Sequence, residues 1–245
     1  MTTKPFLIIQ TGSFGETFTS ITETYGDLDQ TFLDAADLGP DEASIWRVFK
    51  NEPLPQSPDA FAGVIITGSP AMLTSPEAWM ETAAEWLREV VTLNIPVLGV
   101  CFGHQLLAHA LGGRVGRNPN GLESGTVPVR FRANRAEDDL FRILPDNAVF
   151  QAHHYESVVD LPPGTAIFGS NDHDAFHAVR YAPRAWGIQF HPEITADIMR
   201  DITKLEIAME ADKAVSYEKI LNNIEETPLG PVFLKHFKAV ATGAT

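Results

Sequence analysis

The segment "PVLGVCFGHQ", residues 96–105, contains the only cysteine of the 245-residue chain, Cys101. The apolar residues before Cys101 predict a buried strand. The segment "HQLLAHALGG" (104–113) predicts a helix that the two terminal glycines end. Cys101 would therefore lie at a strained strand-to-helix turn, with its side chain projecting from the end of a sheet.

The residues around Cys101 favour a reactive thiol. Gly99 and Gly103 flank it, because β-carbons there would collide in so sharp a turn. The N–H groups of the following helix would favour a thiolate. A buried cysteine that acts as a small hydrophobic residue is the alternative. A partner base elsewhere in the chain would decide between the two.

Three other apolar, β-rich runs end in small or turn residues, at 6–13, 63–70 and 185–193. Residues 75–94 have apolar side chains at helical spacing, with Ser75 as the expected N-cap. Strands alternating with helices predict an α/β fold, a flavodoxin-like doubly wound and mainly parallel sheet with helices on both faces.

The rest of the chain fits the same domain. The stretch 126–190 has short apolar runs with turn residues between them, so we expect a strand-rich insertion. We therefore expect one domain over 1–245, with a core at 6–195 and a helical extension at 196–245. The last amphipathic helix is expected at 229–241, as core or as a dimer contact.

Composition limits the function. The chain has 44% hydrophobic and 20% charged residues and a net charge of −14. This acidity argues against nucleic-acid and anionic-membrane partners, and no apolar run is long enough to span a bilayer. One cysteine can form no internal disulfide, which suits a cytoplasmic protein.

A candidate base lies near the end of the predicted sheet, in "WGIQFHPE" (186–193). His191 and Glu193 are two residues apart, so they share a face of an extended chain. The carboxylate can hold the imidazole in one tautomer, which leaves the other ring nitrogen to accept the thiol proton. A strand-end histidine beside an exposed glutamate is the alternative.

These two motifs together resemble those of the class I glutamine amidotransferases, which carry G-x-C-x-G-x-Q followed by H-P-E. Here they read "GVCFGHQ" (99–105) and "HPE" (191–193). The segment "ITGSP" (66–70) resembles the family's S-G-G-P turn, and "AHHYESV" (152–158) resembles its S-H-x-D-x-V segment. The chain resembles stand-alone members that are similar to the amidotransferase domain of GMP synthase.

The resemblance implies a role for each matching residue. Cys101 would be the nucleophile, His191 the general base and then acid, and Glu193 the residue that orients His191. The oxyanion donors would be the N–H of Phe102 and the turn at Gly68 and Ser69. Gln105 and His154 would contact the substrate. No cofactor and no metal is implied.

Two departures from the family pattern concern the turn and the substrate. Ser69 stands where the family has a second glycine, and it would be strained if that position required a positive φ. Glu156 stands where the family has aspartate. No phosphate-binding loop for a synthetase reaction occurs in the chain.

The resemblance therefore implies hydrolysis of the glutamine side-chain amide through a thioester. A separate synthetase partner and a homodimer are both compatible with it. A γ-glutamyl peptidase with the same three residues is the first alternative. A non-catalytic regulatory or binding module is the second. A wide pocket would favour the peptidase, and a pocket for one amino acid would favour the glutaminase.

Three weaker patterns have simpler interpretations. His173 and His177 have a spacing that could bind zinc on a helix, but no third ligand is evident. "TGSFGET" (11–17) could hold a phosphate but reads more simply as a strand-to-helix turn. His104 and His109 lie on the helix after Cys101, where one of them could approach the site.

Overall fold

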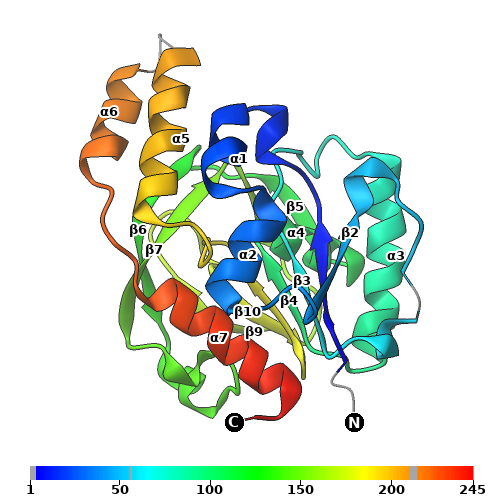
Figure 1. The fold of residues 1–245 in the computed structure, drawn as a ribbon. Coiled ribbons are helices and arrows are strands. Elements are labelled where there is room, and N and C mark those ends of the chain that lie inside the picture. The colour runs from blue at the N-terminus through cyan, green and yellow to red at the C-terminus, as the bar shows by residue number, and fades with distance from the viewer. Residues whose placement is uncertain (1–3, 56, 210–213, 245) are drawn as a thin grey trace.

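The computed structural model describes residues 4–55, 57–209 and 214–244 (Figure 1). Its strands are β1 (Phe6–Gln10), β2 (Ala43–Arg47), β3 (Gly63–Ile66), β4 (Val97–Val100), β5 (Arg114–Arg117), β6 (Glu123–Phe131), β7 (Asn147–His154), β8 (Glu156–Asp160), β9 (Ala166–Ser170), β10 (Ala178–Ala182) and β11 (Ala185–Ile188). Its α-helices are α1 (Thr19–Tyr25), α2 (Leu28–Ala36), α3 (Ala78–Thr92), α4 (Phe102–Ala110), α5 (Ala196–Met209), α6 (Ala214–Asn222) and α7 (Leu229–Thr242). Short 3-10 helices are η1 (Phe14–Glu16), η2 (Val48–Lys50), η3 (Pro58–Ala60), η4 (Ala133–Glu137) and η5 (Phe141–Ile143).

The main sheet has a parallel half and an antiparallel half. Within the described residues its strand order is β2-β1-β3-β4-β11-β10-β9-β6-β7. The pairs from β2 to β11 are parallel, and those from β11 to β7 are antiparallel. The parallel half has the flavodoxin-like order, which confirms the predicted fold class. The strands between α4 and β11 form a strand-rich insertion, as predicted, but it starts with β5 at Arg114 and not at 126, and β11 within the predicted stretch belongs to the parallel half. β5 and β8 pair separately.

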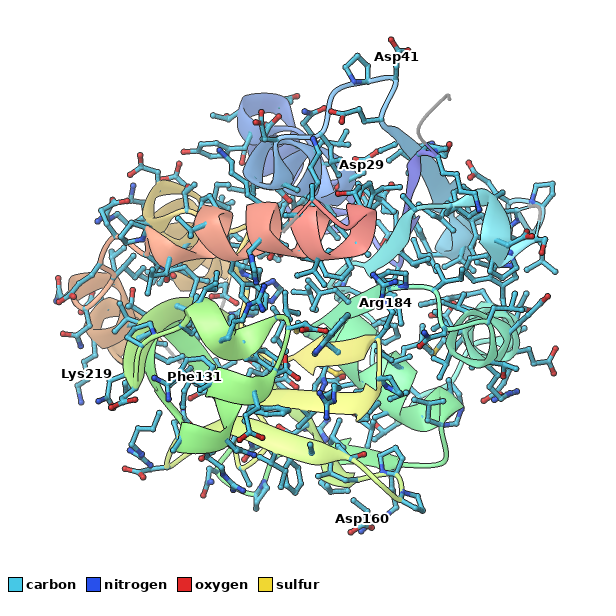
Figure 2. All side chains as sticks on the ribbon, turned by 90° about the horizontal axis from the view of Figure 1, so that it is seen from below. Asp29, Asp41, Phe131, Asp160, Arg184 and Lys219 are labelled. Atoms are coloured by element: carbon cyan, nitrogen blue, oxygen red, sulfur yellow. The ribbon has the colours of Figure 1, made fainter. Side chains whose placement is uncertain are left out.

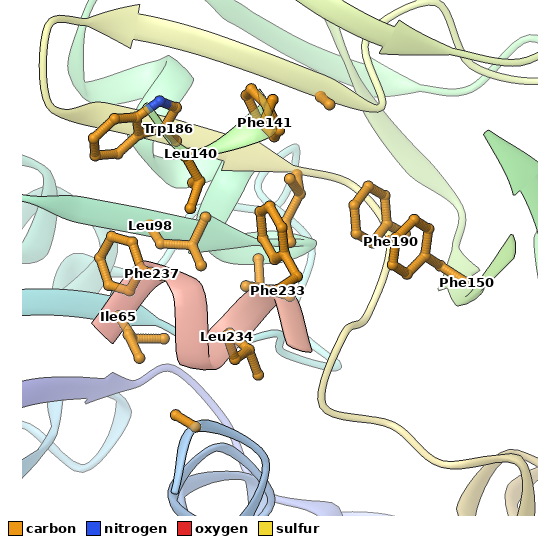
Figure 3. Close-up of a cluster of buried hydrophobic side chains, with 14 of the residues drawn as sticks. Ile65, Leu98, Leu140, Phe141, Phe150, Trp186, Phe190, Phe233, Leu234 and Phe237 are labelled. Atoms are coloured by element: carbon orange, nitrogen blue, oxygen red, sulfur yellow. The ribbon is translucent and has the colours of Figure 1, made fainter. Parts of the chain in front are cut away.

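Helices cover both faces of the sheet (Figure 1). Side chains alternate along β1, so Phe6 and Ile8 pack in one core cluster while Leu7 and Ile9 pack in another. α2 and α7 cover the first cluster, and α3 and α4 cover the second. Figure 3 shows Phe233, Leu234 and Phe237 of α7 packed over the sheet. The segment at 229–241 is therefore a core helix.

Charged side chains lie around the outside of this core. Figure 2 shows Asp41, Asp160 and Lys219 projecting at the edges of the molecule. No helix in the described parts of the chain is long and apolar enough to cross a bilayer.

The predicted start of α3 was wrong by two residues. The helix begins at Ala78 with Glu77 as its N-cap. Ser75 instead closes a turn, because its N–H donates to the carbonyl of Met72 at 3.0 Å. The predicted end of α4 is confirmed, since the helix stops at Ala110 and Gly112 has a φ of +90°.

Candidate functional site

Cys101 lies between β4 and α4, as the sequence predicts. Its backbone has φ 52° and ψ −107°, a combination that is strained for any residue with a β-carbon. The residue is the N-cap of α4 and only 5% of its surface is exposed. The thiol therefore lies at the positive end of a helix and at the carboxyl edge of the parallel strands.

The flanking glycines allow this turn because a β-carbon at either position would collide with backbone atoms. A β-carbon on Gly99 would lie 2.4 Å from the carbonyl oxygen of Gly103. A β-carbon on Gly103 would lie 2.4 Å from the carbonyl oxygen of Ile66. Glycine at both positions lets α4 pack directly against β3 and β4 and fixes where the helix begins.

His191 and Glu193 follow β11 and are both buried. The Nδ1 atom of His191 lies 2.6 Å from Oε1 of Glu193. A β-carbon on Gly68 would lie 2.9 Å from Cε1 of His191 and 3.8 Å from Cβ of Cys101. The imidazole and the cysteine therefore approach the same face of the Gly68 turn.

The charge state of His191 depends on its two neighbours. Burial lowers the pKa of its imidazole, but the Glu193 carboxylate and the Cys101 side chain outweigh burial and hold the pKa well above the usual range. An imidazolium held against a carboxylate on one side can stabilise a thiolate on the other. Such an arrangement can perform nucleophilic acyl transfer.

The turn after β3 is held in place by two hydroxyl groups. Thr11 Oγ1 donates to the Gly68 carbonyl at 2.9 Å, and Ser69 Oγ donates to the Thr11 carbonyl at 2.7 Å. Ser69 is not among the described non-glycine residues with a positive φ. The serine in place of the family's glycine therefore causes no backbone strain, and the turn can still present its N–H groups.

A cavity of about 290 Å³ opens in front of Cys101. The residues at the sheet edge that line it include Gly68, Cys101, Gln105 and His191. The walls from the η1–α1 segment, the start of α2 and α5 are mostly apolar, with Phe14, Phe18, Leu28, Met199 and Ile202. The cavity therefore combines a polar end with an apolar extension.

The sequence did not reveal the walls of this cavity. The residues that it missed include Glu206, which lies on α5, and His153. His153 Nε2 lies 3.1 Å from Glu206 Oε1, and the His153 carbonyl lies 3.8 Å from Sγ of Cys101. The only available signal was the apolar spacing of the tail, which predicts a helix but no position for it.

The two predicted substrate contacts are both hydrogen-bonded inside the protein. Gln105 lines the cavity, and its Nε2 donates to the Glu156 carbonyl at 2.7 Å and to Gln189 at 3.1 Å. His154 belongs to the cavity wall, but its ring contacts Glu123 at 2.8 Å and the Glu156 carbonyl at 3.0 Å. Their contact with a substrate remains a prediction.

Glu156 holds this wall to the loop before α3. Its carboxylate accepts hydrogen bonds from the hydroxyl and the N–H of Thr74. The aspartate-to-glutamate difference from the family pattern therefore lies at a structural contact between two cavity segments.

The other histidines lie away from the cavity. Burial lowers the pKa of His104 to about 3, and its Nδ1 lies 2.9 Å from the Tyr181 hydroxyl. His109 contacts Glu81 on the surface at 2.6 Å. The segment 11–17 is the plain strand-to-helix turn expected, with Ser13 as the N-cap of η1.

One further polar cluster lies inside the insertion. Glu123, His154 and His177 are all buried and bring one ligand atom each within 4.8 Å of the others. Burial lowers the pKa of His154, although the Glu123 carboxylate opposes this effect. His173 and His177 lie on no helix, and His173 instead contacts the Gly121 carbonyl. The cluster has the ligand types of a divalent metal site.

Comparison with known proteins gives the family of this chain. The family model for class I glutamine amidotransferases matches residues 44–204, about two thirds of the chain. The chain belongs to this family. A structure of a glutamine amidotransferase from Thermotoga maritima superposes with a TM-score of 0.78, covering 98% of this chain and 99% of the other at 20% identity, which shows the shared fold.

The relatives of this chain carry several different names. The GMP synthase of Bacillus subtilis is 34% identical over 54% of the chain, but the match spans only 24% of that longer protein. A glutamine amidotransferase-like protein of Schizosaccharomyces pombe is 28% identical over 84% of this chain and 86% of its own. Gamma-glutamyl peptidase 5 of Arabidopsis thaliana is 24% identical, over 84% and 85%.

Proposed function

We propose that this amidotransferase hydrolyses the side-chain amide of glutamine with Cys101 as nucleophile. The observation that carries the proposal is the convergence of the Cys101 and His191 side chains at Gly68, with Glu193 bonded to the far side of the imidazole at 2.6 Å. A nucleophile, a base and an orienting carboxylate are the parts that acyl transfer requires.

The first half of the reaction forms a thioester. The Cys101 thiolate attacks the amide carbon, and the carbonyl electrons move to its oxygen. The N–H of Phe102, which has no partner within the helix as its first residue, and the N–H groups at Gly68 and Ser69 stabilise this oxyanion, at about 3 kcal/mol per aimed donor. The C–N bond then breaks, and the His191 imidazolium gives its proton to the departing ammonia.

The second half releases glutamate. Neutral His191 takes a proton from water, and the resulting hydroxide attacks the thioester carbon. The C–S bond breaks, which restores the thiolate beside a protonated His191. Glu193 remains ionised and keeps the ring in the orientation required for both proton transfers.

The acceptor of the ammonia is a separate question. One of the relatives is a subunit of the glutamine-hydrolysing GMP synthase of Pyrococcus abyssi, 29% identical over 59% of this chain and 75% of its own length. A separate synthetase subunit that takes up the ammonia is therefore the partner that we propose for this reaction.

A γ-glutamyl peptidase is the second candidate function. The walls from the η1–α1 segment, the start of α2 and α5 give the cavity an apolar surface besides its polar end. Ammonia needs no such surface, whereas the amine part of a γ-glutamyl peptide would cover it. The Arabidopsis relative that matches most of this chain carries this activity in its name.

Covalent labelling with 6-diazo-5-oxo-L-norleucine, a glutamine-like diazo-ketone, tests the proposal. We expect mass spectrometry to show one adduct on Cys101, absent in Cys101→Ala, and to show protection by free glutamine. Protection by a γ-glutamyl dipeptide but not by glutamine would favour the peptidase. Labelling at the rate of an ordinary exposed thiol would contradict both reactions and favour a binding module.

A further inference from the structure

Glu123, His154 and His177 form a cluster of ligand atoms in the insertion. Glu123 is the first residue of β6, and it lies directly opposite His154, the last residue of β7. His177 immediately precedes β10. The Oε2 atom of Glu123 lies 2.8 Å from Nε2 of His154 and 3.0 Å from Nε2 of His177. Three nonadjacent segments thus converge on one point.

Because the three side chains are buried, holding the carboxylate and the two imidazoles together costs free energy unless a cation is bound. The side chains of Glu123, His154 and His177 are 6%, 2% and 0% exposed. Among the described residues, the Nδ1 atom of His177 has no hydrogen-bond partner, and its Nε2 atom meets only the Glu123 carboxylate, at 3.0 Å. A buried polar group without a partner costs free energy. The cost of burying the His177 imidazole beside the Glu123 carboxylate is therefore not offset by hydrogen bonds of its ring.

The hydrogen bonds of His154 lead to the same conclusion. Its Nδ1 faces the carbonyl of Glu156 at 3.0 Å, so Nδ1 must carry a proton. Its Nε2 faces a carboxylate oxygen of Glu123, which is also an acceptor. A neutral imidazole has only one N–H, so without a metal the ring can donate to both acceptors only as a buried imidazolium. A metal ion at Nε2 would remove this conflict and leave the Nδ1–H bond as the support that metal-bound histidines usually have.

We infer that Glu123, His154 and His177 bind a divalent transition-metal ion, for which Zn²⁺ is the best match. Two imidazoles and one carboxylate are a common zinc ligand set. Imidazole nitrogens disfavour Mg²⁺ and Ca²⁺, which prefer oxygen ligands. Asn171 donates to the other Glu123 oxygen at 2.6 Å, which orients the carboxylate.

The position of the site indicates a structural role. The metal would join β6, β7 and the start of β10, and the residues after His153 belong to the cavity wall. The His177 carbonyl also accepts a hydrogen bond from Gln189, two residues before His191. The ion would therefore fix the wall that faces Cys101 without contacting the substrate.

Metal content of the full chain tests the inference. We expect mass spectrometry of the untagged protein, purified without chelators, to find about one zinc per chain. The same content is expected in Cys101→Ser, which removes the only thiol, and in His173→Gln, which removes a nearby histidine outside the cluster. We expect less than a tenth of that content in Glu123→Gln and His177→Gln.

Metal-stripped wild-type protein provides a test that does not depend on the folding of the variants. Zn²⁺ at about 100 times its Kd should raise the Tm by about 5–10 °C, and Co²⁺ should give the visible absorption of a low-symmetry site. Wild-type protein that contains no zinc and shows no Tm change with Zn²⁺ would overturn the inference. The cluster would then be an imidazolium–carboxylate pair.

Discussion

The backbone of Cys101 differs from that of every other described residue with an unusual φ. Asp37, Asn51 and Asn94 also have φ near 55°, but aspartate and asparagine tolerate the left-handed region. Cys101 has no such tolerance, and its ψ of −107° lies outside that region. This strained turn holds the Cys101 side chain near Gly68, which His191 also approaches.

Substitution of Cys101 separates this strain from the chemistry. Cys101→Ala and Cys101→Gly should both lose glutamine hydrolysis, since neither has a nucleophile. The glycine variant should be more stable than the alanine variant by about 1 kcal/mol, because only alanine keeps the strained β-carbon. That difference corresponds to a Tm about 2–4 °C higher. Equal Tm values would show that the turn is not strained.

The pH dependence of the reaction should report His191. Its raised pKa keeps the imidazolium present above neutral pH, so the alkaline limb of the diazo-ketone labelling rate should lie well above pH 6.5. Glu193→Gln removes a group that raises this pKa, and the alkaline limb should therefore move to lower pH. In Glu193→Gln we also expect kcat for glutamine hydrolysis to fall by about 10²–10⁴-fold.

Glu206→Gln is the matched control for this change. Glu206 lines the same cavity but contacts His153 instead of His191. An alkaline limb that moves equally in both variants would contradict the role of Glu193.

At the scale of elements, the sequence predicted best those helices and strands whose hydrophobic pattern is complete within one segment. The strands with long apolar runs and α3 and α4 were predicted at nearly the observed positions. β2 was missed because it lies at the edge of the sheet with one buried residue, Trp46. α1 was missed because only Ile21 is buried along its seven residues. Weak burial leaves no periodic pattern to read.

The same reasoning applies to the sites. Cys101, His191 and Glu193 lie in two short motifs, so their order could be recognised along the chain. Glu123 and His177 come together only through the pairing of strands in the insertion. No local spacing connects them, and the His173–His177 spacing, from which no metal site was predicted, does not bring His173 to Glu123, because the His173 ring contacts the Gly121 carbonyl.

α5 gives a test of the apolar cavity wall. Ile202 lines the cavity, whereas Ile198 on the same helix is buried beside it without lining the cavity. Ile202→Ala and Ile198→Ala should each lower the free energy of unfolding by about 2–5 kcal/mol. Only Ile202→Ala should raise the KM for a γ-glutamyl substrate with an apolar amine, while the KM for glutamine stays the same.

Equal KM values in both α5 variants, for both substrates, would contradict the apolar extension as part of the substrate site. The glutaminase proposal would then stand alone, because the polar end at Cys101 is unaffected by either change.

At the scale of the whole molecule, the last helix, α7, packs against the first strand, β1, and so completes the core. Phe237 on α7 packs edge-on against Phe6 of β1, with ring centroids 6.3 Å apart. It also packs against Trp186 of β11 at 6.3 Å. These contacts join segments that are far apart in the chain and cover the face of the sheet opposite α3 and α4 (Figures 1 and 3).

Truncation of this one side chain should therefore affect the stability of the entire fold. Phe237→Ala should lower the free energy of unfolding by about 3–5 kcal/mol, because the buried ring leaves a cavity between α7 and the sheet. Val232→Ala on the exposed face of α7 should change it by no more than about 0.5 kcal/mol. Urea unfolding followed by tryptophan fluorescence measures both values. Because α7 supplies no cavity residue, kcat in the folded fraction should be unchanged. A loss of kcat without a loss of stability in Phe237→Ala would mean that α7 acts on the site as well as on the core.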